Sequence, residues 1–188
     1  MFIGSHAHIR YSEPDDARFV KSLYLEGPPR AALLDVRRER PMPTLQEVRD
    51  MLSQKDAMRG MLFTVEDLEG RLTGWCGLRG VNPEARFAEM TLLYTDDAAY
   101  NAPGAEEVID FLLDHAFGRF GLAKIIVMSL DVETALSACL ERRGFLACGT
   151  QRHTLFSGGG WHDLKTWTLF ARDRHPNASG NTKEAAVL

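Results

Sequence analysis

A short segment between a strand-like run and an amphipathic run has the features of an anion-binding turn. AEMTLLY, residues 88–94, precedes YNAPGAEEV, residues 100–108, and EEVIDFLLDHAFGRF continues from residue 106. Backbone N–H groups at a helix N-terminus point out of the helix and the dipole adds positive charge, so such a turn can bind phosphate. This one has a single glycine, a proline and adjacent acidic residues. Two interpretations follow: a weakened anion cradle, or a plain turn before a capped helix.

The elements that would position this turn can be read from hydrophobic periodicity. Helices are expected at residues 16–25, 44–56, 106–119 and 133–144, and strands at 8–11, 60–67, 71–81, 86–95 and 123–130, with a closing hairpin at 150–172. Thr44 and Glu47 form a capping-box pattern. This order predicts one α/β (α+β) domain over residues 1–175, with a mixed, mostly antiparallel central sheet flanked by helices. The polar residues 176–188 predict a disordered tail.

The composition is typical of a soluble globular protein that does not bind nucleic acid. The 188 residues are 45% hydrophobic and 26% charged, and the net charge of −4 disfavours binding to a phosphate backbone. No apolar run has the length of a membrane span, and no signal peptide is evident. Three cysteines without C-x-x-C spacing indicate reduced thiols in a cytoplasmic protein. No metal site is expected, because no His, Cys and Asp residues have ligand spacing.

Four blocks of sequence, in order and at matching spacing, carry a resemblance to a known family. They are IRYSEPDDARFV, FAEMTLLYTDDAAYNAPGAEEVIDFLLDHAFGRFGLAKI, LERRGF and GTQRHTLFSGGGWHD, which lie between residues 9 and 172. Together they resemble the GNAT superfamily of acetyl-CoA-dependent N-acetyltransferases, in the branch that includes ribosomal-protein and polyamine or sugar-amine acetyltransferases. The resemblance implies a GNAT-like fold and acetyl-CoA as co-substrate.

The family binds the pyrophosphate of acetyl-CoA with a loop of Arg or Gln, two residues, Gly, one residue, then Gly or Ala. These positions fall on Tyr100, Pro103 and Ala105, of which only Ala105 conforms. Tyr100 has no positive charge, Pro103 has no N–H, and Glu106 places a carboxylate that repels phosphate. The resemblance implies the following cofactor-binding residues: Leu92, Leu93, Tyr94, Tyr100, Asn101, Ala102, Pro103, Gly104, Ala105, Glu106 and Glu133, the last where the family has asparagine.

The resemblance also implies the catalytic residues. Glu89 occupies the position of the catalytic glutamate of related histone acetyltransferases and is the expected general base. The alternative is that Glu89 forms an ion pair with Arg79 or Arg86. The family tyrosine that protonates the leaving thiolate falls on Leu140. Tyr94 and Tyr100, near the expected acyl group, are alternative donors if turned inward, and Tyr94 is taken as the candidate acid. Backbone N–H groups of residues 92–94 would polarise the thioester carbonyl.

The function implied is transfer of an acetyl or other acyl group from acyl-CoA to a primary amine of a small molecule or a protein N-terminus. The amine would attack directly, without a covalent enzyme intermediate. The expected partners are acyl-CoA and an amine acceptor that the sequence does not identify, and the expected assembly is a monomer or homodimer. The alternative is a catalytically impaired GNAT-like module for acyl-CoA binding or protein interaction, which the departures at Tyr100, Pro103, Glu133 and Leu140 favour.

Overall fold

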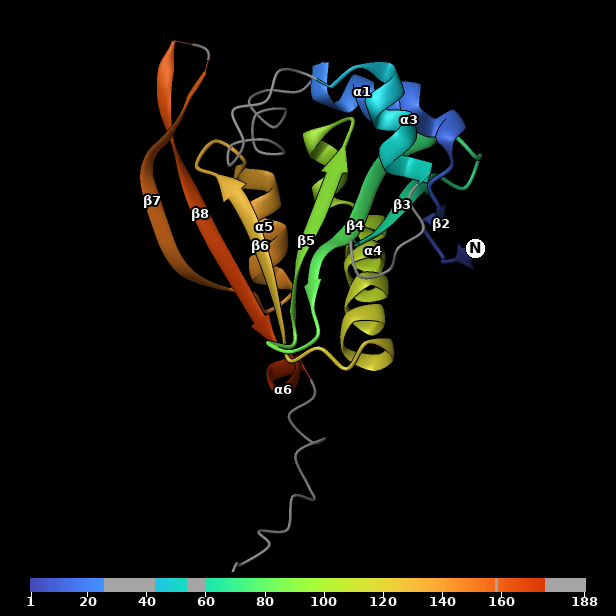
Figure 1. The fold of residues 1–188 in the computed structure, drawn as a ribbon. Helices are drawn as coiled ribbons and strands as arrows, with labels where there is room; N and C mark the ends of the chain where they lie inside the picture. Colours follow the sequence, from blue (N-terminus) through green and yellow to red (C-terminus); the bar gives the residue numbers. More distant parts are fainter. Residues whose placement is uncertain (26–42, 54–59, 158, 175–188) are drawn as a thin grey trace, which may run out of the picture.

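The computed structural model describes residues 1–25, 43–53, 60–157 and 159–174. In these residues eight strands form one sheet in the order β1-β2-β3-β4-β5-β6-β8-β7 (Figure 1). The strands are β1 (Phe2–Ile3), β2 (His8–Tyr11), β3 (Gly60–Glu66), β4 (Leu72–Asn82), β5 (Phe87–Tyr94), β6 (Lys124–Leu130), β7 (Leu146–Ser157) and β8 (Gly160–Phe170). Neighbouring strands are antiparallel except β5 and β6, which are parallel. The mixed, mostly antiparallel sheet is as predicted.

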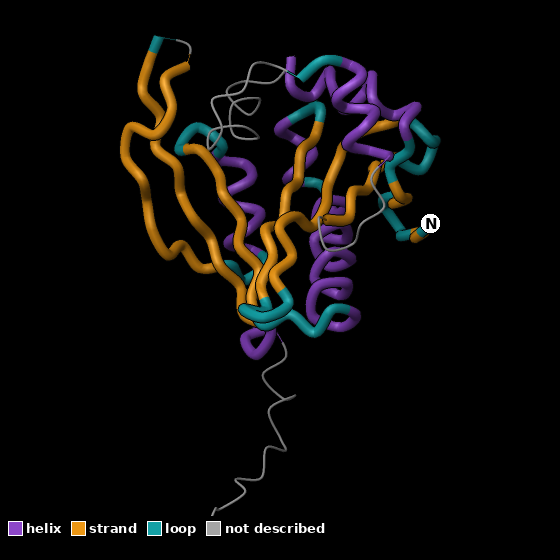
Figure 2. Tube along the Cα trace, viewed as in Figure 1, coloured by secondary structure: helices purple, strands orange, loops and turns teal. Residues whose placement is uncertain are grey.

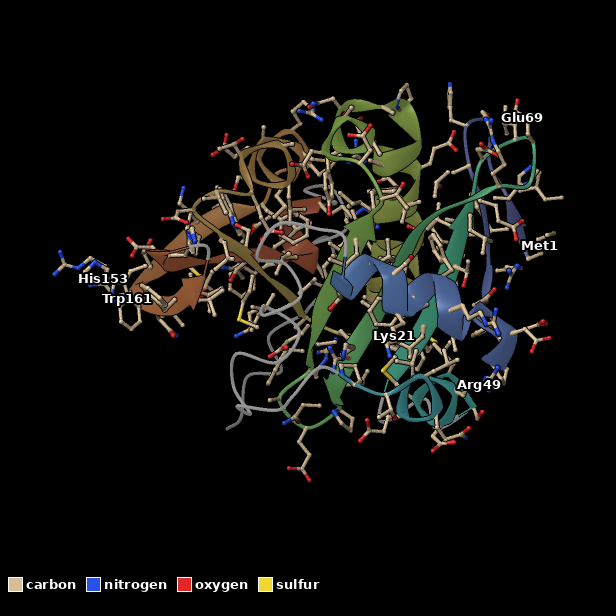
Figure 3. The ribbon with its side chains drawn as sticks, turned by 90° about the horizontal axis from the view of Figure 1, so that it is seen from above. Met1, Lys21, Arg49, Glu69, His153 and Trp161 are labelled. Carbon is tan, nitrogen blue, oxygen red and sulfur yellow. The ribbon has the colours of Figure 1, made fainter. Side chains whose placement is uncertain are left out.

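Helices cover both faces of this sheet (Figure 2). The helical segments are η1 (Pro14–Asp16), α1 (Ala17–Leu25), α3 (Leu45–Ser53), η2 (Asp97–Asn101), α4 (Pro103–Leu113), the π-helix η3 (Asp114–Arg119), α5 (Thr134–Arg142) and α6 (Ala171–Arg174). One core cluster joins the sheet to α4 and α5, and a second joins it to α1 and α3. Seen from above, α1 and α3 lie on the opposite side of the sheet from α4 and α5 (Figure 3).

The parallel pair β5 and β6 is joined over only part of its length. Both strands are described in full, and their pairing consists of Phe87 with Lys124, Ala88 with Ile125 and Glu89 with Ile126. Beyond Glu89 the two strands diverge (Figure 1). Strand β6 is instead paired with β8 from Lys124 to Leu130. The edge of β5 from Met90 to Tyr94 therefore has no ladder partner in β6.

Several local predictions are confirmed and several elements are new. At α3 the Thr44 N–H donates to Glu47 Oε2 at 2.7 Å, and the Glu47 N–H donates to Thr44 Oγ1 at 3.2 Å, so the capping box is present. The helix expected at 106–119 is two segments, with α4 beginning earlier at Pro103, a residue favoured in the first helical position. Strand β1, η2 and α6 were not expected. The tail lies outside the described residues, and the domain boundary at residue 175 stays a prediction.

A partly buried ionic network ties β2 and β3 to η1, immediately before α1. Arg10 of β2 donates two hydrogen bonds to the Asp16 carboxylate, each 2.8 Å long, and one to Glu66 Oε1 at 2.7 Å. Asp16 also accepts from Thr64 Oγ1 at 2.9 Å and from the Glu13 N–H at 2.9 Å. Burial alone would raise the pKa of Asp16, but these hydrogen bonds outweigh it and place the pKa below its usual value of 3.8.

Replacing Asp16 should therefore destabilise the protein in a pH-dependent way. Because the folded-state pKa is lowered, the carboxylate stabilises the fold above the unfolded-state pKa, and this contribution disappears as pH falls through the folded-state value. Asp16→Asn should lower the free energy of unfolding by about 1.5–3 kcal/mol at pH 7. In urea titrations the difference from the parent should shrink below about pH 4.

The exposed neighbour Asp15 supplies the matched control. Asp15→Asn should change the free energy of unfolding by no more than about 0.5 kcal/mol. A pH-independent difference for Asp16→Asn would contradict the assigned role of the carboxylate charge.

Candidate active site

The turn between β5 and α4 is held in a defined conformation by its own backbone. Asp96 caps η2, and its side chain accepts from the Ala98 N–H at 2.8 Å. Ala102 is extended, and α4 begins at Pro103. The Ala105 N–H donates to the Ala102 carbonyl at 3.1 Å. Since Pro103 has no N–H and that of Ala105 is already engaged, the cradle has fewer donors for an anion than the sequence indicated.

Tyr100 lies in the core and not at the surface of the turn. Its side chain is fully buried, and its hydroxyl donates to the Leu92 carbonyl of β5 at 3.0 Å. The ring packs edge-on against Tyr94 at a centroid distance of 5.2 Å. A residue that fastens the turn to the strand thus stands where the resembled family has a cation. The whole of Tyr100 is buried, so neither its side chain nor its backbone is exposed to a cofactor.

Tyr94, the candidate acid, is buried on the sheet face that carries α4. It belongs to the same core cluster as Met90 and Leu92, and its ring fills the space beside Gly74, where an added Cβ would lie 2.6 Å from it. Burial, and secondly the neighbouring Cys76, raise the pKa of Tyr94 well above its usual value. The hydroxyl therefore keeps its proton at neutral pH, as a general acid must.

Glu89, the candidate base, is half-buried and lies on the other face of the sheet. Side chains alternate along a strand, and Leu93 of β5 packs in the cluster of α1 and α3. Glu89, four residues before Leu93, therefore points to the same face as Leu93. It is also the last residue of β5 that pairs with β6, opposite Ile126. The structure therefore places Glu89 and Tyr94 on opposite faces of β5, with the point of strand divergence between them.

The arginines of the alternative interpretation lie differently with respect to Glu89. Arg79 is its direct neighbour in the antiparallel register of β4 and β5. Arg86 donates from Nε and Nη2 to the Gly121 carbonyl, at 2.9 and 2.6 Å. Of the two, Arg79 is the one placed beside Glu89 on the sheet. The general-base and ion-pair roles of Glu89 both stay predictions.

Two further positions that depart from the family pattern have structural roles. Glu133 precedes α5 and is buried, and its Oε2 accepts from the Leu130 N–H at 2.8 Å at the end of β6. Leu140 is fully buried in the core cluster that includes α4 and α5. Its neighbour Cys139 is also buried, and burial raises the pKa of that thiol. Neither Leu140 nor Cys139 is exposed where a leaving thiolate would need a proton.

Two arginines at the end of α5 reach this turn, and the sequence did not indicate them as site residues. Arg142 Nη2 donates to the Tyr100 carbonyl at 2.9 Å, and Arg142 Nε donates to Glu106 Oε1 at 3.3 Å. Arg143 Nη1 lies 3.5 Å from Glu106 Oε2. Glu106 was expected to satisfy the helix dipole and repel phosphate; its pairing with both arginines was not anticipated. In the sequence, both arginines lie in the LERRGF block, which indicated only the end of a helix.

Comparison with known proteins identifies the architecture. No family model matches the sequence, and no curated protein matches it significantly. Among solved structures, the spermidine N-acetyltransferase of Vibrio cholerae in complex with CoA and spermine matches with a TM-score of 0.74 and 21% identity, covering 91% of this chain and 99% of that one. This chain has the GNAT fold. A dodecameric structure of the same enzyme matches with a TM-score of 0.72 and 23% identity, covering 94% and 99% of the two chains.

None of the helices in the described residues is long and apolar enough to cross a membrane. No group of three or more His, Cys, Asp or Glu side chains is placed to hold a metal ion in this part of the chain. The cytoplasmic location and the monomer or homodimer stay predictions.

The hydrogen bond from Tyr100 to the Leu92 carbonyl can be tested by removing one oxygen atom. Tyr100→Phe should lower the free energy of unfolding by about 1–3 kcal/mol, because the buried carbonyl loses its donor. Chemical denaturation measures this effect. Tyr11→Phe, at an exposed tyrosine, is the control and should stay within about 0.5 kcal/mol. Equal stability of the two variants would show that the Tyr100 hydroxyl does not hold the turn.

Proposed function

We propose that this protein is an acyl-CoA-dependent N-acyltransferase that transfers an acetyl group from acetyl-CoA to a primary amine. The observation that supports this most directly is the divergence of β5 from β6 after Glu89, immediately before the turn into α4. A Vibrio cholerae spermidine N-acetyltransferase with the same fold has been solved with CoA and spermine. A small organic amine is therefore the first acceptor class to test.

The residues at the divergence fit an extended acyl-CoA. The edge of β5 from Met90 to Tyr94 offers backbone N–H and C=O groups, and an extended polyamide chain can pair with such an edge as an added strand does. Apolar side chains of Met90 and Leu92 on β5 and Val127 on β6 line the core face beside it. At the far end of the edge, the N-terminus of α4 lies where the pyrophosphate would be expected.

Each step of the transfer has a group to perform it under this proposal. Glu89 takes a proton from the ammonium form of the acceptor, and the neutral nitrogen attacks the thioester carbon. Backbone N–H groups of residues 92–94 stabilise the negative oxygen as the N–C bond forms. The C–S bond then breaks, Tyr94 gives its proton to the leaving thiolate, and the second proton of the attacking nitrogen returns through water to the Tyr94 phenolate, while Glu89 releases its proton to solvent. Glu89 and Tyr94 lie on opposite faces of β5 and five residues apart, ~17 Å along the strand, so at least one of the two proton transfers would pass through water.

The second candidate is a GNAT-like module that binds acyl-CoA without turnover. It is favoured by specific observations: Leu140 is buried in the core, and the cradle lacks the N–H groups of Pro103 and Ala105. Both candidates predict CoA binding, and only the first predicts thiol release. Calorimetric titration with CoA combined with thiol release from acetyl-CoA therefore separates them.

The general-base assignment predicts a large kinetic effect without a large binding effect. Glu89→Gln should lower turnover about 10²–10⁴-fold at neutral pH, the usual scale for a positioned base. CoA affinity should be unchanged, because the proposed contacts with CoA lie on the backbone and at the turn. Thiol release should be measured with spermidine, spermine, amino sugars, aminoglycosides and peptide N-termini as acceptors.

Glu84→Gln is the matched control, because Glu84 lies exposed in the turn between β4 and β5. It should turn over like the parent. Turnover of Glu89→Gln at the parent rate with any acceptor would refute the base and favour a structural pair with Arg79. A parent protein that binds CoA and releases no thiol with any acceptor class would favour the binding module.

The weakened cradle can be repaired at one position. Pro103→Ala restores one backbone N–H at the first turn of α4 and keeps a good helix former. A new hydrogen bond to a charged phosphate contributes about 1.5–3 kcal/mol at most, so CoA should bind up to about tenfold to hundredfold more tightly. Calorimetry measures the change. An affinity equal to that of the parent would place the pyrophosphate away from Pro103.

A further inference from the structure

An exposed ion pair between Arg142 and Glu106 lies at the turn where the pyrophosphate is proposed to bind. Arg142 and Glu106 are 3.3 Å apart between Nε and Oε1, and their side chains are 41% and 38% exposed. One residue ends α5 and the other lies in the first turn of α4. A surface pair with this exposure contributes little to stability, so the contact is not needed to hold the fold together.

The backbone of the turn fixes the position of this guanidinium. Arg142 Nη2 donates to the Tyr100 carbonyl at 2.9 Å, and Tyr100 is itself anchored to Leu92. A guanidinium has five N–H donors in a rigid fork. Nη2 of Arg142 is engaged by the Tyr100 carbonyl, and Nε is directed at the Glu106 carboxylate. The positive charge that Tyr100 does not supply is thus delivered to the same turn by α5.

We propose that Arg142 binds the pyrophosphate of acyl-CoA, and that Glu106 occupies Arg142 until the cofactor displaces it. The proposal rests on the proposed function, since it assigns a ligand within the same CoA site. A phosphate oxygen accepts from a guanidinium with the same charge-assisted geometry as a carboxylate. Exchange of Glu106 for phosphate therefore conserves the hydrogen bonds of Arg142 and turns the carboxylate outward.

The neighbouring Arg143 is paired mainly with Asp110. Arg142 is therefore the arginine that can exchange Glu106 for a phosphate. Arg143 is 27% exposed and hydrogen-bonds through Nη2 to Asp110, one turn further along α4 than Glu106. It contacts Glu106 only at 3.5 Å. Arg143 therefore keeps α5 docked on α4 when Glu106 moves, and the site can open without separating the two helices.

The first test removes the positive charge. Arg142→Gln should bind CoA about tenfold to hundredfold more weakly in calorimetric titrations. Its affinity should also depend less on salt concentration, because one phosphate contact is lost. Arg71→Gln is the matched control: Arg71 is an exposed arginine paired with Asp67 and Glu69 between β3 and β4, and its loss should leave the affinity unchanged. Unfolding curves establish that both variants are folded.

The second test asks whether Glu106 competes for Arg142 or merely repels phosphate. Glu106→Gln in the parent should tighten CoA binding by about twofold to fivefold, the scale of an exposed ion pair. In the Arg142→Gln background the same change should give less than half of that gain, since no guanidinium remains to be released. Equal gains in both backgrounds would show independent repulsion and overturn the exchange.

A third measurement identifies the phosphate and separates this proposal from the function on which it rests. The loss of affinity in Arg142→Gln should persist with dephospho-CoA, which keeps the pyrophosphate and lacks the 3′-phosphate. A loss seen with CoA alone would overturn the assignment to the pyrophosphate. Parent-like binding by Arg142→Gln would overturn the role of Arg142 and leave the CoA site intact. No binding by the parent at millimolar CoA would overturn the proposed function as well.

Discussion

The constraint on which the site depends is the end of pairing between β5 and β6 at Glu89 and Ile126. Two parallel strands in one sheet would ordinarily continue side by side. Here β6 is held by β8 over its whole length, while β5 stays with β4 from Phe87 to Tyr94. Each strand follows its own antiparallel neighbour, and the sheet opens between them. The backbone edge that results is half of the proposed cofactor site.

The turn at the end of that edge is secured by contacts that differ from the family loop. A tyrosine and an arginine replace the expected combination of cation and glycines: Tyr100 fastens the turn to β5 from inside, and Arg142 fastens it to α5 from outside. Both bonds involve backbone carbonyls, so they fix the path of the chain and leave the helix N-terminus of α4 in place. The turn therefore has a defined geometry although its sequence departs from the resembled loop pattern.

The parts of the structure that sequence reasoning predicted are those governed by local rules. The capping box of Thr44 and Glu47 depends on residues three apart, and it is present as expected. The mixed, mostly antiparallel sheet was also predicted, from the order of helices and strands along the chain and from the family blocks. The inward orientation of Tyr100 and the pairing of Arg142 with Glu106 were missed. The pair joins residues 36 positions apart, and no periodicity relates the end of one helix to the start of another.

The placement of Glu89 and Tyr94 on opposite faces of β5 has a consequence for how the two substrates would enter and leave the site. If Glu89 is the proton acceptor and Tyr94 the proton donor, as proposed, the amine and the thiol would lie on different sides of the sheet. An acceptor that approached from the side of Glu89 would then not have to pass the cofactor. Under that assignment a ternary complex could assemble in either order and release its two products independently.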